Sequence, residues 1–326
     1  MGERGDVSAG TAPVLYEFVG ERVGIRADDE AMRARIAAVW NGFRTAAGGD
    51  LRALIHIVQR ASESPVRHGQ QFNNGTLLVI ADRHKLITGS LGATPWQLHI
   101  EAYGRSTDFV YYYLFEPLLL MVLKRCNLVH WHGAAVSRNG QVLLIVGATG
   151  SGKSTTALSL LLHGYTFVAD DELFLREACG RVSVYGLDSA VHFTDETAAL
   201  LKGLPPLSAA SPQVWRGPRR KRRLDAAGMW PTVANGPAIV GPVGGIVFPR
   251  IEKTGRCGLR MLSRLETLRR LLQQPPKEYP AAIVDAPSVA QQFAVCAALA
   301  ETARGVELVL GGDLDRVPAL LREAIG

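Results

Sequence analysis

The sequence has few cysteines and no long uninterrupted apolar run, and both shortages narrow the kind of protein it encodes. Its four cysteines lie far apart without a Cys-x-x-Cys spacing, so neither a zinc site nor a disulfide framework is indicated. The first thirty residues lack the basic start and apolar stretch of a signal peptide. The most apolar run, Leu114 to Leu123, contains Glu116 and Pro117. We therefore expect a cytoplasmic protein with no membrane partner.

The chain also lacks a large excess of one charge, although its cations are unevenly placed. With 326 residues, 47% of them hydrophobic, it is long enough for one large or two medium domains. The net charge is only +6, but Arg216 and the run from Arg219 to Arg223 concentrate six cations in eight positions. This run forms a solvated loop or contacts nucleotide phosphates or an acidic peptide. Nucleic acid is the least favoured partner, because no aromatic residues interleave with the cations.

The first part of the chain predicts a separate subdomain without an assigned function. Residues 1 to about 12 resemble a frayed leader. Strands or short elements are expected over 14–19, 51–58 and 76–80, and helices over 31–39 and 109–123. We place an N-terminal α+β subdomain at 1–128 and the domain with the chemistry at 129–326.

A complete GxxxxGK[ST] phosphate-binding loop is the most informative motif in the sequence. It lies between an apolar run that predicts a strand and a segment that predicts a helix. Glycines in such a loop let backbone N–H groups surround a phosphate, the lysine reaches the β- and γ-phosphates, and the serine hydroxyl ligates Mg²⁺. The expected nucleotide-binding residues are Gly147, Ala148, Thr149, Gly150, Ser151, Gly152, Lys153, Ser154 and Thr155.

A β-hairpin before this loop predicts where His132 lies. Two β-like runs, 134–137 and 142–146, are joined through Asn139-Gly140, a strong two-residue turn signal. In that register facing positions sum to 279, so His132 lies opposite Gly147, at the phosphate end of the strand. The alternative is a strand-end histidine held only by backbone contacts.

An acidic pair follows the next predicted strand. Residues 154–163 predict a helix that ends near Gly164, and 165–169 predict a strand parallel to 142–146 and beside it. Asp170 and Asp171 would then lie next to the phosphate loop, where carboxylates suit a Mg²⁺-nucleotide site. A turn or helix cap is the alternative role for the pair.

Later segments are less specific. Strands are expected over 183–185, 245–248 and 306–310, and helices over 265–272, 289–302 and 317–324. The Pro-, Gly- and Arg-rich stretch from Gly203 to Pro242 predicts a mobile loop or insertion near the site.

Three elements together resemble the kinase domain of the bacterial HPr kinase/phosphorylase family: His132-Gly133, the loop from Gly147 to Ser154, and the segment from Val168 to Asp171. The resemblance implies an α/β phosphate-loop kinase core related to phosphoenolpyruvate carboxykinases, and Mg²⁺- and ATP-dependent phosphorylation of a serine hydroxyl. It also implies site roles. Asp170 takes the hydroxyl proton, Asp171 and Ser154 contact Mg²⁺, Lys153 clamps the β- and γ-phosphates, and His132 assists at the γ-phosphate. The division of work between the two aspartates stays open.

One departure from the family affects the expected acceptor. The Glu-containing signature that HPr kinases carry downstream is not recognisable, since the nearest region, from Val184 to Asp188, has neither Glu nor Arg. The sequence looks more like divergent members that accompany ribosomally made peptides such as lasso peptides, which implies a serine on a precursor peptide or a protein as acceptor. Alternatives are a kinase for free serine or another hydroxylated metabolite, and a non-catalytic ATP-binding regulator. A homo-oligomer is left open.

Overall fold

The computed structural model describes residues 12–46, 48–186, 190–204, 211–216, 219–226, 229–230, 242–252, 255–274 and 286–325. The expected leader at 1–11 lies outside these residues. So do Leu187 and Asp188, which belong to the segment where the family's Glu-containing signature is not recognisable. The chain divides into two compact units between Cys126 and Asn127, and the C-terminal unit includes the described residues from Ala286 onward. Several sheets with packed helices confirm the mixed α/β class. Within the described residues, no helix combines the length and apolar character needed to cross a bilayer.

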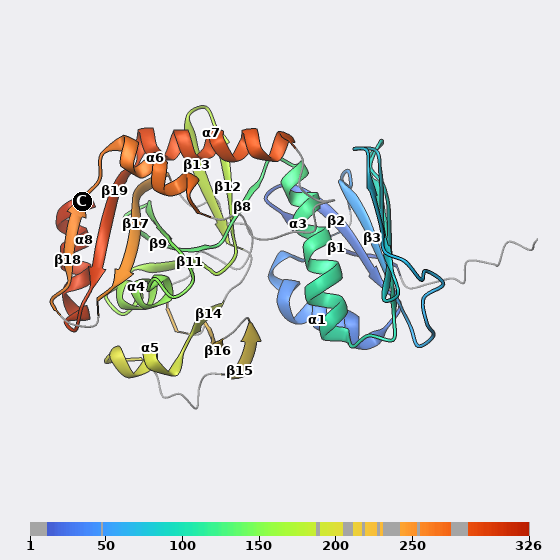
Figure 1. Ribbon diagram of the computed structural model, residues 1–326, viewed down its shortest axis with the longest axis horizontal. Coiled ribbons are helices and arrows are strands. Elements are labelled where there is room, and N and C mark those ends of the chain that lie inside the picture. Colours follow the sequence, from blue (N-terminus) through green and yellow to red (C-terminus); the bar gives the residue numbers. More distant parts are fainter. Residues whose placement is uncertain are drawn as a thin grey trace, which may run out of the picture. The chain divides into compact units, whose positions relative to one another are not determined.

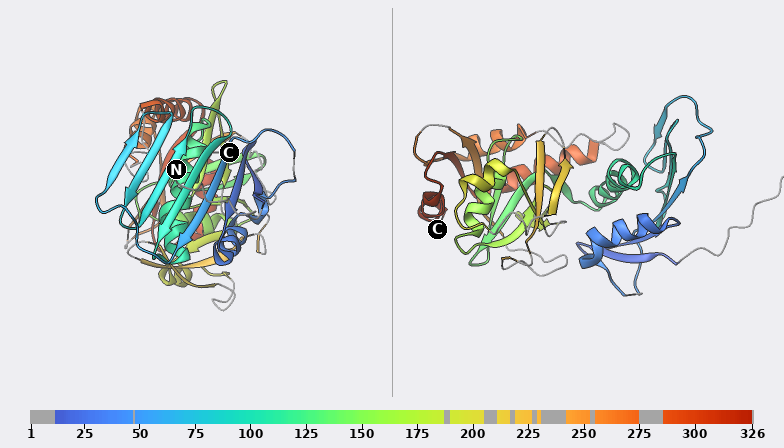
Figure 2. Two further views of the ribbon diagram at one scale, coloured as in Figure 1. Left: turned by 90° about the vertical axis from the view of Figure 1, so that its right-hand side faces the viewer. Right: turned by 90° about the horizontal axis from the view of Figure 1, so that it is seen from below.

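The N-terminal unit is built on a seven-stranded mixed sheet, seen face on in the left view of Figure 2. Its strand order is β1-β2-β3-β7-β6-β5-β4, and β2, β3 and β7 run parallel. The strands are β1 (Val14–Phe18), β2 (Glu21–Ala27), β3 (Ala53–Arg60), β4 (Gln70–Asn73), β5 (Leu77–Asp82), β6 (Lys85–Ser90) and β7 (Trp96–Tyr103). The expected strands over 14–19, 51–58 and 76–80 are confirmed, with small differences at their ends.

Helices cover one face of this sheet. α1 (Glu30–Trp40) starts at Asp29, whose side chain accepts a hydrogen bond from the Met32 N–H, and it buries Met32, Ile36 and Trp40. The apolar stretch predicted as one helix is continuous but irregular. α2 (Thr107–Val110) leads through a π-helical turn, η2 (Tyr111–Phe115), into α3 (Glu116–Arg125). The widened turn accommodates Pro117, which cannot donate an N–H within a helix.

The C-terminal unit centres on a six-stranded sheet of order β11-β9-β10-β17-β19-β18 (Figure 1). The strands are β9 (Gly133–Arg138), β10 (Gln141–Val146), β11 (Thr166–Asp170), β17 (Val243–Ile251), β18 (Gly258–Met261) and β19 (Arg304–Leu310). β10, β17 and β19 are parallel neighbours. The expectation that β11 lies beside β10 is wrong, because β9, the hairpin partner of β10, occupies that position. β11 still runs in the direction of β10, so both end at the same sheet edge.

The hairpin register follows the turn signal as predicted. Gln141 pairs with Arg138 and Val146 with Gly133, so the facing positions sum to 279. Asn139 and Gly140 have φ values of 50° and 76°, the left-handed pair that a two-residue turn of this kind requires. The register therefore places His132 directly opposite Gly147.

Side chains alternate across β10 between two cores. Leu143 and Ile145 pack with α4 (Lys153–Leu161) and α8 (Val317–Ile325). Leu144 and its neighbours on the other face pack with α6 (Arg264–Leu272) and α7 (Ala286–Thr302). The expected strands and helices of the last hundred residues are confirmed. The sheet is thus covered by helices on both faces, which leaves the strand ends as the exposed edge.

Two smaller sheets complete this unit. One has the order β13-β12-β8 and the other β14-β16-β15. Their strands are β8 (Val129–Trp131), β12 (Leu173–Ala178), β13 (Arg181–Gly186), β14 (Ala190–Phe193), β15 (Ser211–Arg216) and β16 (Arg219–Asp225), and α5 (Asp195–Leu200) follows β14. The prediction of a loop from Gly203 to Pro242 is wrong for 211–216 and 219–225, which pair as strands. Residues 205–210, 217–218, 227–228 and 231–241 lie outside the described part.

The chain passes between the six-stranded and the first small sheet at two adjacent corners. β8 ends at Trp131 and β9 begins at Gly133, so His132 is the first corner. β11 ends at Asp170 and β12 begins at Leu173, so Asp171 and Glu172 form the second. Because β8 pairs with β12 and β9 with β11, the two corners lie side by side.

Candidate active site

The loop between β10 and α4 is shaped by glycines at three positions. Gly150 and Gly152 have φ values of 82° and 106°, in the left-handed region that residues with a Cβ rarely adopt. A Cβ on Gly147 would lie 2.7 Å from the Ser151 Oγ atom. Since α4 starts at Lys153, the loop delivers backbone N–H groups and the positive end of a helix to one point.

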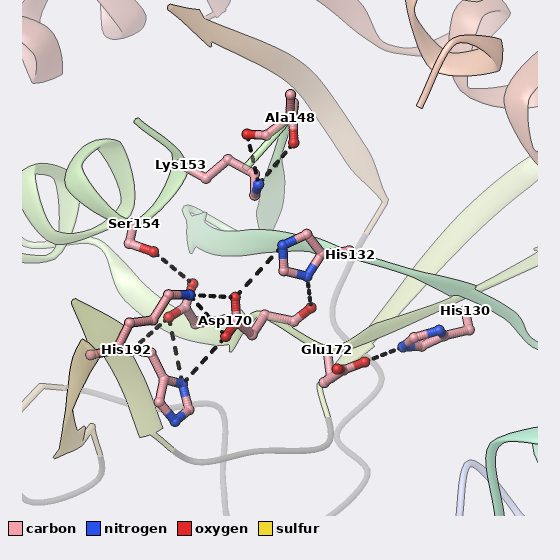
Figure 3. Close-up of polar contacts among 11 residues, drawn as sticks. His130, His132, Ala148, Lys153, Ser154, Asp170, Glu172 and His192 are labelled. Carbon is pink, nitrogen blue, oxygen red and sulfur yellow. Dashed lines mark hydrogen bonds and ion pairs between the residues drawn. The ribbon is translucent and has the colours of Figure 1, made fainter. Parts of the chain in front are cut away.

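Lys153 folds back over this loop. Its Nζ atom donates to the Gly147 carbonyl at 2.8 Å and to the Ala148 carbonyl at 3.2 Å (Figure 3). The side chain is buried, and this burial lowers the pKa of Lys153 against the opposing attraction of Asp171. The ammonium therefore lies at the mouth of the loop, held by carbonyl groups that an incoming anion can replace.

Asp170 faces Ser154 with one carboxylate oxygen and accepts a backbone hydrogen bond from β14 with the other. Its Oδ1 atom lies 3.5 Å from the Ser154 Oγ atom, and its Oδ2 atom accepts a 2.7 Å hydrogen bond from the His192 backbone N–H. Only 2% of Asp170 is exposed. Its carboxylate is therefore deep and paired with the hydroxyl at the start of α4.

Asp171 occupies a strained position next to it. Its φ is 66°, and the Glu172 N–H donates to the Asp170 carbonyl at 2.8 Å, so the three residues form a γ-turn. Such left-handed conformations of non-glycine residues are concentrated at functional sites. The turn points neighbouring carboxylates in different directions, one toward Ser154 and the other toward Lys221, whose Nζ atom is 3.1 Å from each Asp171 carboxylate oxygen.

The charge balance around Asp171 favours its ionised form. Burial by itself raises the pKa of this carboxyl, but the cation of Lys221 and the imidazoles of His132 and His192 outweigh burial, so the pKa of Asp171 lies below its ordinary value. The His192 Nδ1 atom lies 3.9 Å from Asp170 and 4.0 Å from Asp171. The pair is therefore surrounded by nitrogen groups from three elements.

His132 contacts the second corner as well. Its Nδ1 atom donates to the Asp171 carbonyl at 2.9 Å, and its Nε2 atom lies 3.8 Å from the Asp171 carboxylate. Burial lowers the pKa of His132 in spite of the nearby Asp171 carboxylate. Because Nδ1 donates to the Asp171 carbonyl, Nε2 is the ring nitrogen that faces the acidic pair. The backbone contact considered from the sequence is present, and the ring also faces the acidic pair.

Glu172 anchors the corner on the other side. Its carboxylate makes a buried contact with the Nε2 atom of His130, and the His130 side chain is fully buried. His130 faces Phe174 across β8 and β12, and the two rings are 5.1 Å apart. This pair ties the turn that carries Asp171 to the first small sheet.

One cavity collects most of the residues singled out from the sequence. Thr149, Gly150, Gly152, Ser154 and Thr155 line it together with His132, Lys153 and Asp171. Gly147, whose carbonyl accepts from Lys153, and Asp170, which faces Ser154, are next to this set. Gly147, Ala148 and Ser151 line a separate hollow against α6.

Sequence reasoning missed three contributors. Lys221 lies within the basic run, so a signal existed, but nothing indicated that a strand would direct it at Asp171. Arg222, its neighbour, pairs with Asp195. His192 and Thr197 carry no motif and reach the cavity only through the pairing of β14 with β16 and through α5.

The oxygen groups suit a magnesium ion bound together with phosphates. Among the described residues, no group of three or more His, Cys, Asp or Glu side chains is arranged to hold a metal by itself. Mg²⁺ in phosphate-transfer sites takes one or two carboxylates and completes its shell with water and phosphate oxygens. The half-buried Ser154 hydroxyl and the buried Asp170 carboxylate, which face each other at 3.5 Å, are hard oxygen ligands of the kind that Mg²⁺ prefers.

Comparisons with known proteins agree with the motifs. Over 70 residues, 22% of this chain, the sequence is 38% identical to the HPr kinase/phosphorylase of Lactobacillus acidophilus. The match spans about a fifth (21%) of that relative's length. The structure of the Hpr(Ser) kinase/phosphatase from Coxiella burnetii aligns with 60% of this chain and 94% of that chain, at 13% identity and a TM-score of 0.28. No family model matches the chain. The chain is thus HPr kinase-like and divergent in sequence.

Proposed function

We propose that the protein is a Mg²⁺- and ATP-dependent kinase that transfers the γ-phosphoryl group to a serine hydroxyl of a peptide or protein. The observation that carries this proposal is the convergence of Lys153, His132, Asp171 and Lys221 on one cavity beside a glycine-rich loop. Phosphoryl transfer depends mainly on positioning and on neutralising oxygen charge, and this cavity offers cations, backbone N–H groups and a carboxylate. The similarity to an HPr kinase/phosphorylase supports the same reaction class.

The loop from Gly147 to Thr155 would hold the phosphate chain as a phosphate-loop core. Lys153 would exchange the carbonyl groups of Gly147 and Ala148 for β- and γ-phosphate oxygens, since an ammonium gains more from an anion than from neutral carbonyls. The relation to phosphoenolpyruvate carboxykinases is a further part of this proposal and rests on the family resemblance.

Magnesium would be held at Ser154, with Asp170 as its nearest carboxylate. When bound, the ion would offset negative charge on the phosphate oxygens. The 3.5 Å approach of Asp170 to Ser154 supports this pairing, whereas Asp171 is directed to Lys221. This assignment is the reverse of the one implied by the family resemblance, in which Asp170 is the base and Asp171 the metal contact.

Asp171 would then be the carboxylate that orients and deprotonates the acceptor. It lines the cavity that an acceptor side chain must enter, while Asp170 is 2% exposed and faces Ser154. The serine oxygen attacks the γ-phosphorus, the bond from that phosphorus to the β,γ-bridging oxygen breaks, and Asp171 takes the hydroxyl proton. A carboxylate with a lowered pKa is a weak base, but a loose transition state needs the hydroxyl oriented more than it needs early proton removal.

The acceptor is proposed to be a peptide, including a ribosomally made precursor of the lasso type. The missing downstream Glu and the basic strand β16 support a substrate other than HPr, and the cations of β16 suit an acidic segment near the phosphorylated serine. Free serine and similar metabolites form the alternative acceptor class.

The matched pair Asp170→Asn and Asp171→Asn tests the proposal with labelled ATP, candidate precursor peptides and free serine. Asn keeps the shape of both side chains and tolerates the left-handed backbone at position 171. We expect Asp171→Asn to keep Mg-ATP affinity and lose transfer by about 100-fold or more, and Asp170→Asn to lose Mg²⁺ affinity. Exposed Asp315→Asn is the control.

Each possible outcome has a definite meaning. Transfer only to metabolites would overturn the peptide acceptor. ATP binding without transfer to any acceptor would favour a regulatory nucleotide-binding protein. Undiminished transfer by both Asn variants would remove the carboxylates from the mechanism.

A further inference from the structure

Two large aliphatic side chains are exposed inside the same cavity. Leu200, at the end of α5, is 62% exposed, and Ile251, at the end of β17, is 53% exposed. Both line the cavity that contains Lys153 and Asp171. Exposed apolar side chains that line a cavity mark a place where an apolar part of a ligand is covered.

Ile251 is placed at the loop by the parallel sheet. β17 runs alongside β10, so its end reaches the same edge as the glycine loop. A Cβ built on Gly152 would lie 3.3 Å from the Ile251 Cγ1 atom, so this side chain packs against the first turn of α4. The apolar surface therefore begins where the phosphate-binding N–H groups end.

Leu200 is placed by a contact between two helices. The Thr197 hydroxyl lies 3.3 Å from the Thr155 hydroxyl, which ties α5 to the first turn of α4. Leu200 follows Thr197 by three residues, nearly one helical turn. α5 starts just after His192 and Phe193 of β14, so the chain moves away from the acidic pair before it reaches Leu200.

The cavity thus has two chemically different ends. His132, Asp171 and Lys221 make the end at the two corners charged, whereas Leu200 and Ile251 add aliphatic surface near Thr197 and Gly152, where Glu196 of α5 also lines the cavity. A nucleoside triphosphate has the same order of parts: a reactive terminal phosphate, a phosphate chain, and a flat heterocycle that is poorly hydrated on its faces.

We propose that Leu200 and Ile251 form the nucleobase subsite, and that they cover the faces of the base of the bound nucleotide. This inference rests on the proposed function, because it takes the loop to hold the phosphates. Aliphatic contacts to a ring face do not read hydrogen-bonding edges, so these two residues supply affinity for a base without selecting among bases.

The test compares Mg-ATP with Mg-tripolyphosphate, which has the phosphates but no base, by titration calorimetry on the full chain. The variants are Leu200→Ala, Ile251→Ala and their combination, with Leu265→Ala as the control, because Leu265 is 76% exposed on α6 and lines none of the cavity. We expect the double variant to bind Mg-ATP about tenfold or more weakly and tripolyphosphate with unchanged affinity.

The outcomes separate this inference from the proposed function. If the double variant binds Mg-ATP and Mg-tripolyphosphate as tightly as the wild type binds each of them, the nucleobase subsite is elsewhere and the proposed role of the phosphate loop is unaffected. Equal losses for both ligands would show that the variants act on the loop, which also overturns the subsite. A wild-type chain that binds neither ligand would remove the proposed function and this inference with it.

Discussion

The ammonium of Lys221 lies 3.1 Å from both carboxylate oxygens of Asp171, although the two residues are fifty positions apart in the sequence. Burial of Asp171 favours its neutral form, and the Lys221 cation, together with the imidazoles of His132 and His192, reverses that preference. Strand β16 therefore contributes to the charge state of a residue on the β11–β12 corner.

Replacement of this cation should raise the pKa of Asp171. In Lys221→Met, burial is no longer offset by the ammonium, so the acidic limb of the pH–rate profile should move to higher pH by about one unit or more. Carboxyl NMR of Asp171 gives the same shift without turnover. The exposed Lys202→Met is the control. An unmoved limb together with an unmoved carboxyl signal would show that Lys221 does not set this charge.

Gly152 should tolerate no side chain, whereas Gly164 at the other end of α4 should tolerate one. A methyl group on Gly152 would overlap Leu310, and its φ is 106°. Gly164 has a φ of 83° but no atom within 4 Å of a built Cβ. We expect Gly152→Ala to lose about 2 kcal/mol or more of unfolding free energy and to bind ATP weakly. Gly164→Ala should lose about 1 kcal/mol and bind ATP normally. Urea unfolding and ATP titration measure both; equal losses would exclude close packing as the reason for Gly152.

His132 should make stability depend on mildly acidic pH. Its pKa in the folded chain lies below the ordinary value because the ring is partly buried, so the unfolded chain binds the proton more readily. Its contribution is present above the unfolded pKa of about 6.5 and is lost as the pH falls toward the folded value. The urea midpoint should therefore fall less between pH 7.5 and 5.5 in His132→Gln than in the wild type, with exposed His68→Gln as the control. The same fall in urea midpoint in His132→Gln and in the wild type would contradict the lowered pKa of His132.

The buried contact between His130 and Glu172 should stabilise the corner cooperatively. Removal of one partner from a buried hydrogen-bonded pair leaves the other polar group unsatisfied and typically destabilises by about 1 to 3 kcal/mol, so His130→Ala and Glu172→Gln should each unfold at clearly lower urea concentration. Because they remove the same contact, the double variant should lose less than the sum of the single losses. Strict additivity of the three unfolding free energies would show that the pair is not coupled.

The parts of the site that follow from local sequence could be predicted. The glycine loop, the turn at Asn139-Gly140 and the acidic pair each lie within a few residues of the element that positions them. The hairpin register was therefore correct to the residue, and His132 lies opposite Gly147. The helices α6 and α8 were found because their apolar periodicity is strong, and α7 is a long helix rich in alanine.

The remainder depends on contacts between distant segments. The position of β11 next to β9 is decided by competition for the edge of β9, which no local pattern records. β16 was expected to be a loop because five consecutive cations are rare in a strand, but two of them have acidic partners, Asp171 for Lys221 and Asp195 for Arg222. Strands β2, β4, β6 and β7 were also missed. β4 buries none of its residues, whereas β6 and β7 alternate between buried and half-buried positions.

The left-handed backbone at position 171 limits which amino acids can replace this aspartate without disturbing the corner. Asparagine and glycine adopt this conformation readily, whereas β-branched residues do not. Replacement of Asp171 by alanine or valine would remove the carboxylate and also change the backbone conformation of the corner between the two sheets. The asparagine variant alone separates the charge of the side chain from the path of the main chain.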